Sequence, residues 1–284
     1  MERANDIGLL ADTIVVEKLS IDWVAACGKL VNDLQSVCWV HSSPLQQNSE
    51  PTIARLCMSA RLETQSMPAE AYIFDAYGTL FDVHSAAARH SAEIGERWQV
   101  LSDIWRTKQL EYTWVRSLAG QRATFWQVTQ EALDFAIAAS GGLDAALRDK
   151  LLSAYRELDA YPEVPGVLGA LRAQGAKVAI LSNGDPAMLA DAVRSAGVGD
   201  LFDAVLSVEP AGIFKPAPRV YELATSRFGL PPRNMSFLSS NRWDIAGAKA
   251  YGFCTVWINR GGRPDEYPDL AADTVLDDLR GLIA

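Results

Sequence analysis

The chain has 284 residues, of which 49% are hydrophobic, and it carries a formal net charge of −9. This length is enough to bury one large domain or one domain with an insert. The acidic balance argues against a nucleic-acid surface, which needs clustered lysine and arginine, but it does not exclude a locally basic pocket for a small anion.

The four cysteines form no Cys-x-x-Cys pair, and three of them precede residue 60. A disulfide framework or a zinc site is therefore not expected, and reduced thiols are the default. No apolar run reaches the ~18 residues that indicate a membrane span. The first residues also lack the charged and apolar regions of a signal peptide. We therefore expect a cytoplasmic protein with no membrane and no nucleic-acid partner.

Residues 1–66 differ in character from the rest of the chain. Residues 42–52 are polar and contain Pro44 and Pro51, which is typical of a linker. Residues 8–40 have enough apolar content for one or two short helices but no residues that suggest chemistry. We predict a poorly ordered N-terminal extension over 1–66, and the regular organisation starts at Met67.

From Met67 onward, short apolar runs alternate with helical patterns. The predicted strands are 71–75, 177–182, 202–208, 235–239 and 255–258. Their nearly continuous apolar character is expected for strands that are buried on both faces of a parallel sheet. Between them, Asp185-Pro186 has the pattern of an N-cap followed by proline at the first helical position, and Gly229 that of a helix end. The alternation predicts an α/β fold with a doubly wound parallel sheet.

The alternation is interrupted after the first strand. Residues 84–160 show no strand pattern but have apolar side chains at helical spacing over 101–119, 125–140 and 143–158. A helical insert there follows the carboxyl end of a strand, where open α/β sheets bind ligands, and it would exclude water from the site. We therefore predict a core domain formed by 67–83 and 161–284, and a helical cap domain over 84–160.

Polar side chains follow the carboxyl ends of four predicted strands. Asp75 ends the first strand, where a buried carboxylate is costly unless it is used. The glycine that follows allows a tight turn, with backbone N–H groups facing back toward that carboxylate. Ser182 and Asn183 end the second strand, before a helix N-terminus that suits an anion. Lys215 follows the third strand, and Asp244 follows the fourth.

Each of these residues also has an ordinary structural interpretation. Asp75 could cap a loop, the segment 182–184 could be a common turn, and Asp244 could be a helix N-cap. A lone lysine such as Lys215 is most often a solvated surface charge, but beside Asp75 it would keep the carboxylate ionised. The four strand ends converge on one crevice in this fold class, so together they favour a catalytic site.

At these residues the sequence resembles the haloacid dehalogenase superfamily, over about 70–284. Most members of that superfamily are phosphatases, with Asp-x-Asp in the first motif and paired acids in the fourth that hold magnesium. Here the first motif is DAYGT over 75–79, with Tyr77 in place of the second acid, and the fourth is SSNRWD over 239–244. These departures, and the segment 105–112, resemble the type II L-2-haloacid dehalogenase branch.

The departures agree with the chemistry that the resemblance implies. An alkoxide leaving group needs a proton from a general acid, whereas halide leaves as a stable anion. A phosphate dianion facing an aspartate needs a metal to offset repulsion, whereas a 2-haloacid carries a single carboxylate away from the attacked carbon. We therefore expect no cofactor and no metal ligands.

The resemblance implies that Asp75 displaces halide from a small L-2-haloalkanoic acid, and that water hydrolyses the resulting aspartyl ester to a D-2-hydroxy acid. The implied catalytic residues are Asp75, Lys215, Asp244, Ser239 and Asn241. The implied substrate- and halide-binding residues are Arg106, Ser182, Asn183, Thr79, Tyr77, Tyr221, Leu110, Phe125 and Trp243.

These residues have different implied roles. Arg106 and Asn183 would stabilise the departing halide, and Ser182 would hold the substrate carboxylate with backbone amides of the first loop. Asp244 would orient or deprotonate the water, assisted by Lys215, and the remaining polar residues would support these steps. Four side chains would form an apolar wall for the alkyl group, with plain core packing as the alternative for each: Tyr77, Leu110, Phe125 and Trp243.

Three other functions stay open at this point. A magnesium-dependent phosphatase of the same superfamily is opposed by Tyr77 and by the missing acid pair. A serine- or histidine-based α/β-hydrolase lacks the G-x-S-x-G motif, and all three histidines precede the late position that its base requires. A non-catalytic binding protein would not be expected to retain both Asp75 and Asp244. Members of the family are often dimers, so a homodimer is a further expectation.

Overall fold

The computed structural model describes residues 69–283, so the extension predicted over 1–66 lies outside the described residues. A six-stranded parallel sheet has the order β3-β2-β1-β4-β5-β6. The strands are β1 (Ala71–Phe74), β2 (Lys177–Ser182), β3 (Ala204–Ser207), β4 (Met235–Ser239), β5 (Cys254–Ile258) and β6 (Thr274–Leu276). The prediction of a doubly wound parallel sheet is confirmed.

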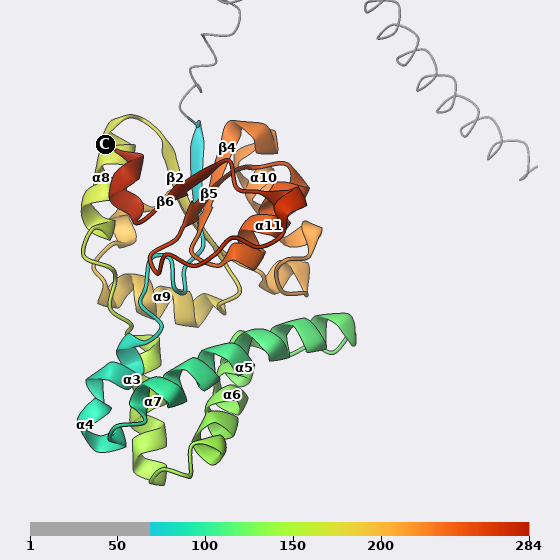
Figure 1. Cartoon of the computed structure of the whole chain (residues 1–284). Coiled ribbons are helices and arrows are strands. Elements are labelled where there is room, and N and C mark those ends of the chain that lie inside the picture. The colour runs from blue at the N-terminus through green and yellow to red at the C-terminus, as the bar shows by residue number, and fades with distance from the viewer. Residues whose placement is uncertain (1–68, 284) are drawn as a thin grey trace, which may run out of the picture. The chain divides into compact units, whose positions relative to one another are not determined.

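The helices that connect the later strands cover both faces of the sheet. They are α8 (Val164–Ala173), α9 (Pro186–Ser195), α10 (Pro218–Phe228) and α11 (Arg242–Tyr251). Helices α10 and α11 pack side by side on one face, whereas α8 lies on the other, as right-handed crossovers require (Figure 1). Since β1 pairs with β2 on one side and with β4 on the other, its carboxyl end borders the point where the strand order reverses. Open sheets of this kind bind ligands at that point.

The strand prediction succeeded for five strands and missed the sixth, and burial explains its success for the three central strands. Ile73, Ile180 and Phe237 on the three central strands are fully buried. Burying an apolar side chain of this size contributes roughly 1.5–3 kcal/mol. By contrast, the edge strand β6 has only three residues, of which Thr274 and Val275 are exposed, so its apolar run is too short to indicate a strand.

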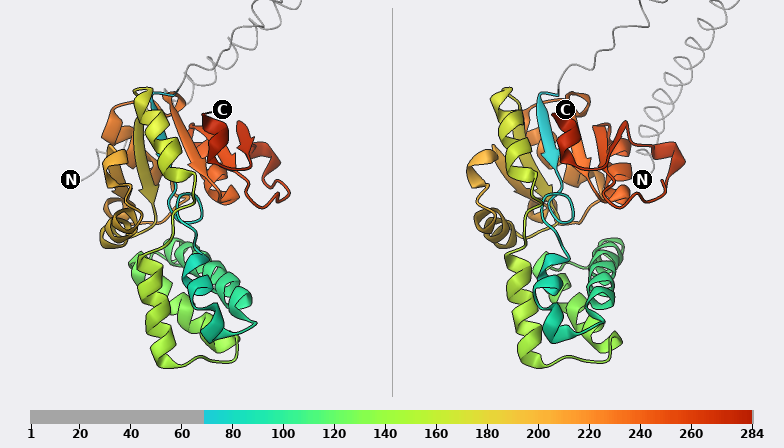
Figure 2. Two further views of the ribbon diagram at one scale, coloured as in Figure 1. Left: turned by 90° about the vertical axis from the view of Figure 1, so that its left-hand side faces the viewer. Right: turned by 60° about the vertical axis from the view of Figure 1, so that its left-hand side comes forward.

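Between β1 and α8 the elements are all helices. They are α3 (Ser85–Arg89), α4 (Ser91–Ile94), α5 (Trp98–Leu118), α6 (Phe125–Ala139) and α7 (Ala145–Arg156). Figures 1 and 2 show these helices gathered beyond the carboxyl ends of the strands; we refer to α3–α7 as the cap helices. The exact boundaries of a cap domain at 84 and 160 remain a prediction. None of the helices within residues 69–283, including the 21-residue α5, has the length and hydropathy to cross a bilayer.

The chain that returns from the cap helices is tied to the loop after β1. Tyr161 donates its backbone N–H to the carbonyl of Leu80 at 3.0 Å. The guanidinium of Arg260 lies 3.8 Å from the centre of the Tyr161 ring and also donates to the carbonyl of Thr79 at 3.1 Å. The loop that follows Asp75 is therefore braced both by the returning chain and by the residues after β5.

Asp185 links the end of β2 to the cap helices in a way that the sequence did not predict. The residue occupies the N-cap position of α9, but its side chain does not cap that helix. Its two carboxylate oxygens accept instead from the backbone N–H groups of Phe125 at 2.9 Å and Trp126 at 2.7 Å. The predicted N-cap position and the proline that follows it are confirmed, but the side chain bonds α6 instead of α9, because the first turn of α6 offers two unpaired donors at the positive end of its helix dipole.

Candidate active site

Asp75 lies immediately after β1 and is 6% exposed. Its Oδ1 accepts from Lys215 Nζ at 3.1 Å, and its Oδ2 accepts from Thr79 Oγ1 at 3.0 Å and from Asn241 Nδ2 at 2.8 Å. Ser239 Oγ lies 3.5 Å from the same Oδ2. These four donors come from three separate segments of the chain, and they offset the desolvation of the carboxylate and fix its orientation.

Lys215 bridges two buried carboxylates. Its side chain is 1% exposed, and its Nζ lies 3.1 Å from Asp75 Oδ1 and 2.8 Å from Asp244 Oδ2. Burial alone would lower the pKa of Lys215, but the charges of Asp244 and Asp75 raise it above the ordinary lysine value. Lys215 is therefore a buried ammonium and not the solvated surface charge of the alternative interpretation.

Asp244 is fully buried in the first turn of α11. Burial raises the pKa of Asp244 to about 6, although the Lys215 ammonium and a hydrogen bond from Tyr221 act in the opposite direction. Tyr221 Oη donates to Asp244 Oδ1 at 2.7 Å, and burial raises the pKa of this phenol well above its usual value. The N-cap position of α11 is held by Asn241, so the N-cap interpretation of Asp244 is wrong. A carboxylate with a pKa near 6 is suited to accept a proton from water near neutral pH.

The end of β2 brings two further polar side chains to the same edge of the sheet. Ser182 is fully buried, and its Oγ accepts from the backbone N–H of Gly184 at 3.1 Å. Asn183 Oδ1 accepts from the backbone N–H of Lys215 at 2.9 Å. Since the amide oxygen of Asn183 is occupied by this bond, its Nδ2 group is the part of the side chain that can donate to a ligand.

The loop after β1 forms the predicted tight turn but directs its amides differently. Gly78 has a φ of 92°, a conformation that glycine adopts without strain. Its N–H donates to the carbonyl of Phe81, and the N–H of Thr79 donates to that of Ala76. The prediction that these amides face the preceding carboxylate is wrong, because carbonyls of the turn accept them. Among the described residues, Ala76 and Tyr77 have amides without such a partner, and these can still donate to a ligand.

Arg106 extends from α5 to the core side of the site. Its Nη2 donates to the carbonyl of Tyr77 at 3.0 Å and to Asn241 Oδ1 at 3.2 Å. Because Asn241 also donates to Asp75, the guanidinium is one side chain away from that carboxylate. The structure therefore brings this cap residue and the strand-end residues together, as the sequence predicted.

Aromatic rings form one wall beside these polar groups. Tyr77 is buried, and its ring centre lies 5.5 Å from that of Phe125 on α6 and 5.8 Å from that of Tyr155 on α7. The ring centre of Phe125 also lies 6.2 Å from that of Phe214, the residue before Lys215. The cap helices thus provide apolar surface directly against the first loop.

The other two predicted wall residues, Trp243 and Leu110, lie on α11 and α5. Trp243 is half-buried on α11, and its ring meets the ring of Trp114 on α5 edge to face at 5.4 Å. Leu110 is half-buried on α5, and its carbonyl accepts from Thr113 Oγ1. Trp243 therefore joins the core to the cap helices.

Gln109 and Tyr155 belong to the site but were not predicted from the sequence. Gln109 is 1% exposed, and its Oε1 accepts from Arg106 Nη1 at 2.8 Å and from Tyr155 Oη at 3.1 Å. The available signal was a glutamine three residues after Arg106, on the same face of a helix. Tyr155 had no comparable signal, because its place depends on how α7 packs.

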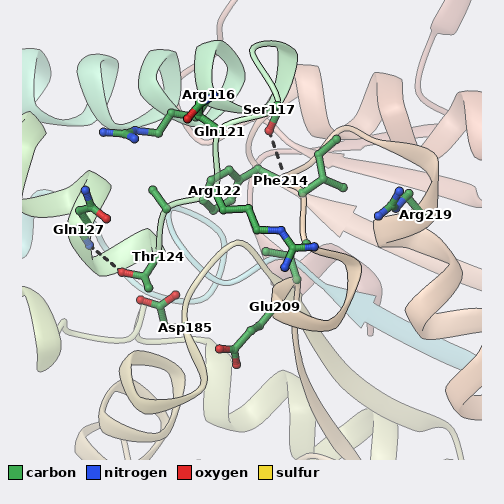
Figure 3. Close-up of a pocket in the computed structure, with 15 residues that line it drawn as sticks. Arg116, Ser117, Gln121, Arg122, Thr124, Gln127, Asp185, Glu209, Phe214 and Arg219 are labelled. Carbon is green, nitrogen blue, oxygen red and sulfur yellow. Dashed lines mark hydrogen bonds between the residues drawn. The ribbon is translucent and has the colours of Figure 1, made fainter.

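A cavity of about 470 Å³ adjoins the site. Its lining comes from the end of α5, the loop before α6 and the chain after β3, as Figure 3 shows for Ser117, Thr124 and Phe214. Since the Phe214 ring packs on Phe125, the cavity lies against the ring pair that borders Tyr77. None of the predicted site residues lines this cavity.

The carboxylates of the site are arranged around a lysine. Within residues 69–283, no group of three or more His, Cys, Asp or Glu side chains is placed to hold a metal ion. The site instead provides one oriented carboxylate, one buried ammonium, one carboxylate of raised pKa and one guanidinium. Such a set can perform nucleophilic displacement at carbon followed by hydrolysis of an ester.

Three comparisons with known proteins agree with one another. The model of a family described as haloacid dehalogenase-like hydrolase matches residues 69–252. (S)-2-haloacid dehalogenase 1 of Pseudomonas sp. (strain CBS-3) is 50% identical over 201 residues, which cover 70% of this chain and 88% of that protein. The (S)-2-haloacid dehalogenase of Pseudomonas sp. (strain YL) is 45% identical over 211 residues, which cover 74% of this chain and 91% of that protein.

Solved structures show the same relationship. The L-2-haloacid dehalogenase from Xanthobacter autotrophicus with chloropropionic acid covalently bound has a TM-score of 0.69 and 37% identity, and covers 75% of this chain and 96% of that chain. A second L-2-haloacid dehalogenase structure has a TM-score of 0.74 and 44% identity, and covers 76% of this chain and 98% of that chain. Both likenesses therefore extend over almost the whole length of the solved proteins.

Proposed function

This chain belongs to the haloacid dehalogenase-like hydrolases, in their (S)-2-haloacid dehalogenase branch, and on that premise we propose that it hydrolyses small L-2-haloalkanoic acids to D-2-hydroxy acids. The observation that carries this proposal is the Asp75 carboxylate, which is oriented by Lys215 and Asn241 next to the guanidinium of Arg106. The relatives named above are dehalogenases, so the comparisons offer no support for the magnesium-dependent phosphatase alternative.

In the first step, Asp75 attacks C2 of the substrate from the side opposite the halogen. A carboxylate oxygen forms the new C–O bond while the C–halogen electron pair leaves with the halide, and an aspartyl ester results. Arg106 and the Nδ2 group of Asn183 offer positive charge and N–H donors to the departing halide. The related structure with chloropropionic acid covalently bound supports an ester of this kind. Back-side displacement inverts C2, which accounts for a D product from an L substrate.

In the second step, water attacks the carbonyl carbon of the ester. Asp244 accepts a proton from this water, a role that suits a carboxylate whose pKa is raised to about 6. Lys215 lies against both acids and stabilises the negative charge that develops on the ester oxygen, with Ser239 and Asn241 as further donors. Collapse of this intermediate releases the 2-hydroxy acid and restores the Asp75 carboxylate.

The remaining predicted residues bind the substrate or orient the two acids. We assign the binding of the substrate carboxylate to Ser182 and to the backbone amides of Ala76 and Tyr77. Thr79 donates to Asp75, and Tyr221 donates to Asp244, so each acid has its own orienting hydroxyl. We assign the apolar wall for the alkyl group to Tyr77, Phe125, Trp243 and Leu110.

Three finer features belong to the same proposal. The reaction needs no metal or cofactor, because Lys215 supplies positive charge beside the acids and halide leaves without a proton. The free Cys254 and the absence of Cys-x-x-Cys pairs in the sequence favour a cytoplasmic location. The exposed apolar side chains of Val115 and Leu118 at the end of α5, which are 57% and 90% exposed, favour a homodimer.

The test is halide release from L- and D-2-chloropropionate in the presence of EDTA. We expect wild-type protein to release chloride from the L form alone, Asp75→Ala to release none, and Asp103→Ala, whose side chain is 73% exposed on α5, to match wild type. No release from either enantiomer, with phosphate freed from a phosphoester once magnesium is restored, would contradict the proposal and favour the phosphatase.

A further inference from the structure

Gln109 lies within a buried chain of hydrogen bonds among the cap helices. Its Oε1 accepts from Arg106 Nη1 at 2.8 Å and from Tyr155 Oη at 3.1 Å, while its Nε2 donates to Thr129 Oγ1 at 2.7 Å. The side chains of Gln109 and Thr129 are 1% and 0% exposed, so neither exchanges these partners freely with water. A buried amide with three bonds of this kind is held in one orientation.

The direction of the chain is set by Thr129. Its hydroxyl donates to the carbonyl of Phe125, four residues earlier on α6, at 2.7 Å. The oxygen of Thr129 must therefore accept from Gln109, and this requires Nε2 to face α6 and Oε1 to face Arg106. A flipped amide would place two donors against each other at Arg106 and two acceptors against each other at Thr129.

The guanidinium of Arg106 is consequently held from two sides. Nη1 is bonded to Gln109 on the cap side, and Nη2 is bonded to Tyr77 and Asn241 on the core side. These three bonds leave two of the five guanidinium N–H groups for an anion. We propose that Gln109 is a positioning residue that sets the direction of the free Arg106 donors toward the departing halide, an inference that rests on the proposed dehalogenation.

The neutrality of Gln109 is part of this role. A glutamine oxygen orients the guanidinium without cancelling its charge, so the charge remains available to the halide. A glutamate of the same shape would form an ion pair with Arg106 and weaken its attraction for a second anion. Gln109→Glu therefore changes charge at constant shape, whereas Gln109→Met removes the acceptor at similar volume.

The first test is single-turnover halide release from L-2-chloropropionate and L-2-bromopropionate. We expect both Gln109 variants to slow the first step about 10- to 100-fold, as misplaced catalytic groups do. The loss is larger for chloride than for bromide, because the poorer leaving group depends more on Arg106. Thr129→Val, which removes the hydroxyl that directs the amide, shifts the chloride-to-bromide ratio in the same sense. Gln99→Glu makes the same charge change on the exposed face of α5 and leaves both rates unchanged.

The second test needs no turnover and uses sodium bromide as the probe. Saturable quenching of tryptophan fluorescence reports bromide binding, and we expect binding at least tenfold weaker in Gln109→Glu and Gln109→Met than in wild type and Gln99→Glu. Thermal unfolding of each variant identifies loss of fold. Wild-type bromide binding together with an unchanged chloride-to-bromide ratio in folded Gln109 variants would overturn the inference. If wild type released no halide, the proposed function would fail, and the bromide titration would still decide the role of Gln109.

Discussion

Lys215 Nζ lies 3.1 Å from Asp75 Oδ1 and 2.8 Å from Asp244 Oδ2, so one buried ammonium joins the two acids of the site. The lysine follows β3, whereas Asp75 directly follows β1 and Asp244 lies in α11. Three segments far apart in the sequence therefore meet at one charge. The same cation orients the nucleophile in the first step and lies beside the proton acceptor in the second.

Lys215→Met should remove both stability and activity. The substitution leaves two neighbouring buried carboxylates without a cation, and breaking a buried ion pair in this way costs about 3–5 kcal/mol. Urea unfolding measures the loss of unfolding free energy, and halide release should fall below detection. The control is Lys177→Met, at a side chain that is 58% exposed, which we expect to change the unfolding free energy by less than about 0.5 kcal/mol. Equal stability of the two variants would argue against the bridging role.

Asp244→Asn should stop the reaction after the first step. Asp75 and Arg106 remain in place, so halide is displaced, but asparagine cannot accept a proton from the attacking water. We predict release of one equivalent of chloride per active site, followed by very slow turnover. Mass spectrometry of the intact protein should then show one added carboxyethyl group after incubation with L-2-chloropropionate. Continuous turnover at the wild-type rate would exclude Asp244 as the proton acceptor.

The ionisation of Asp244 should set the pH dependence of ester hydrolysis, and a substitution of Tyr221 should shift it. Because the pKa of Asp244 is raised to about 6, hydrolysis should slow as the pH falls through that value and the carboxylate becomes protonated. The hydrogen bond from Tyr221 favours the charged carboxylate, so Tyr221→Phe should raise this pKa and move the acid limb upward by roughly one pH unit. Tyr251→Phe, whose hydroxyl bonds Thr225, is the matched control. If the acid limb of the pH–rate profile stayed in place or moved to lower pH in Tyr221→Phe, the result would contradict the assignment of this limb to Asp244.

Gly247→Ala should destabilise the protein although it improves helix propensity. A Cβ at Gly247 in α11 would lie 2.5 Å from Pro216 Cβ and closer still to Tyr221 Oη, which donates to Asp244. Such overpacking costs roughly 1–3 kcal/mol. The control Gly169→Ala in α8, where no atom lies within 4 Å of the added Cβ, should instead stabilise by about 0.5–1 kcal/mol. Urea unfolding measures the change in unfolding free energy for both variants. If Gly247→Ala stabilised the protein, the close approach of Tyr221 and Pro216 to residue 247 would not require glycine there.

The acids and the lysine of the site were predictable because they follow strands. Asp75, Lys215 and Asp244 each come after an apolar run, and parallel strands bring their carboxyl ends to one edge whatever the details of packing. The sequence alone could not decide whether Lys215 is solvated, because its burial depends on two acids that are distant in the chain. Within the predicted apolar wall, the rings of Tyr77 and Phe125 meet, and the roles of Leu110 and Trp243 there stay predictions.

The contacts of Gln109 and Asp185 could not be predicted from the sequence. The partners of Gln109 on α6 and α7 are 20 and 46 residues away, so no local pattern indicates that its amide is buried. Asp185 has the local pattern of an N-cap, but a different helix supplies its donors. Both contacts depend on how the cap helices pack on one another and on the core, and that packing is a tertiary property.

The most direct test of the mechanism follows the oxygen that enters the product. The wild-type protein, in excess over L-2-chloropropionate, completes a single turnover in water labelled with heavy oxygen, and mass spectrometry then examines both the product and the peptide that contains Asp75. Because water attacks the carbonyl carbon of the ester, we predict that the label appears in the Asp75 carboxylate and that the product hydroxyl carries the original oxygen of the protein. Label in the product hydroxyl, with none in Asp75, would mean that water displaces the halide directly and would contradict the aspartyl-ester mechanism.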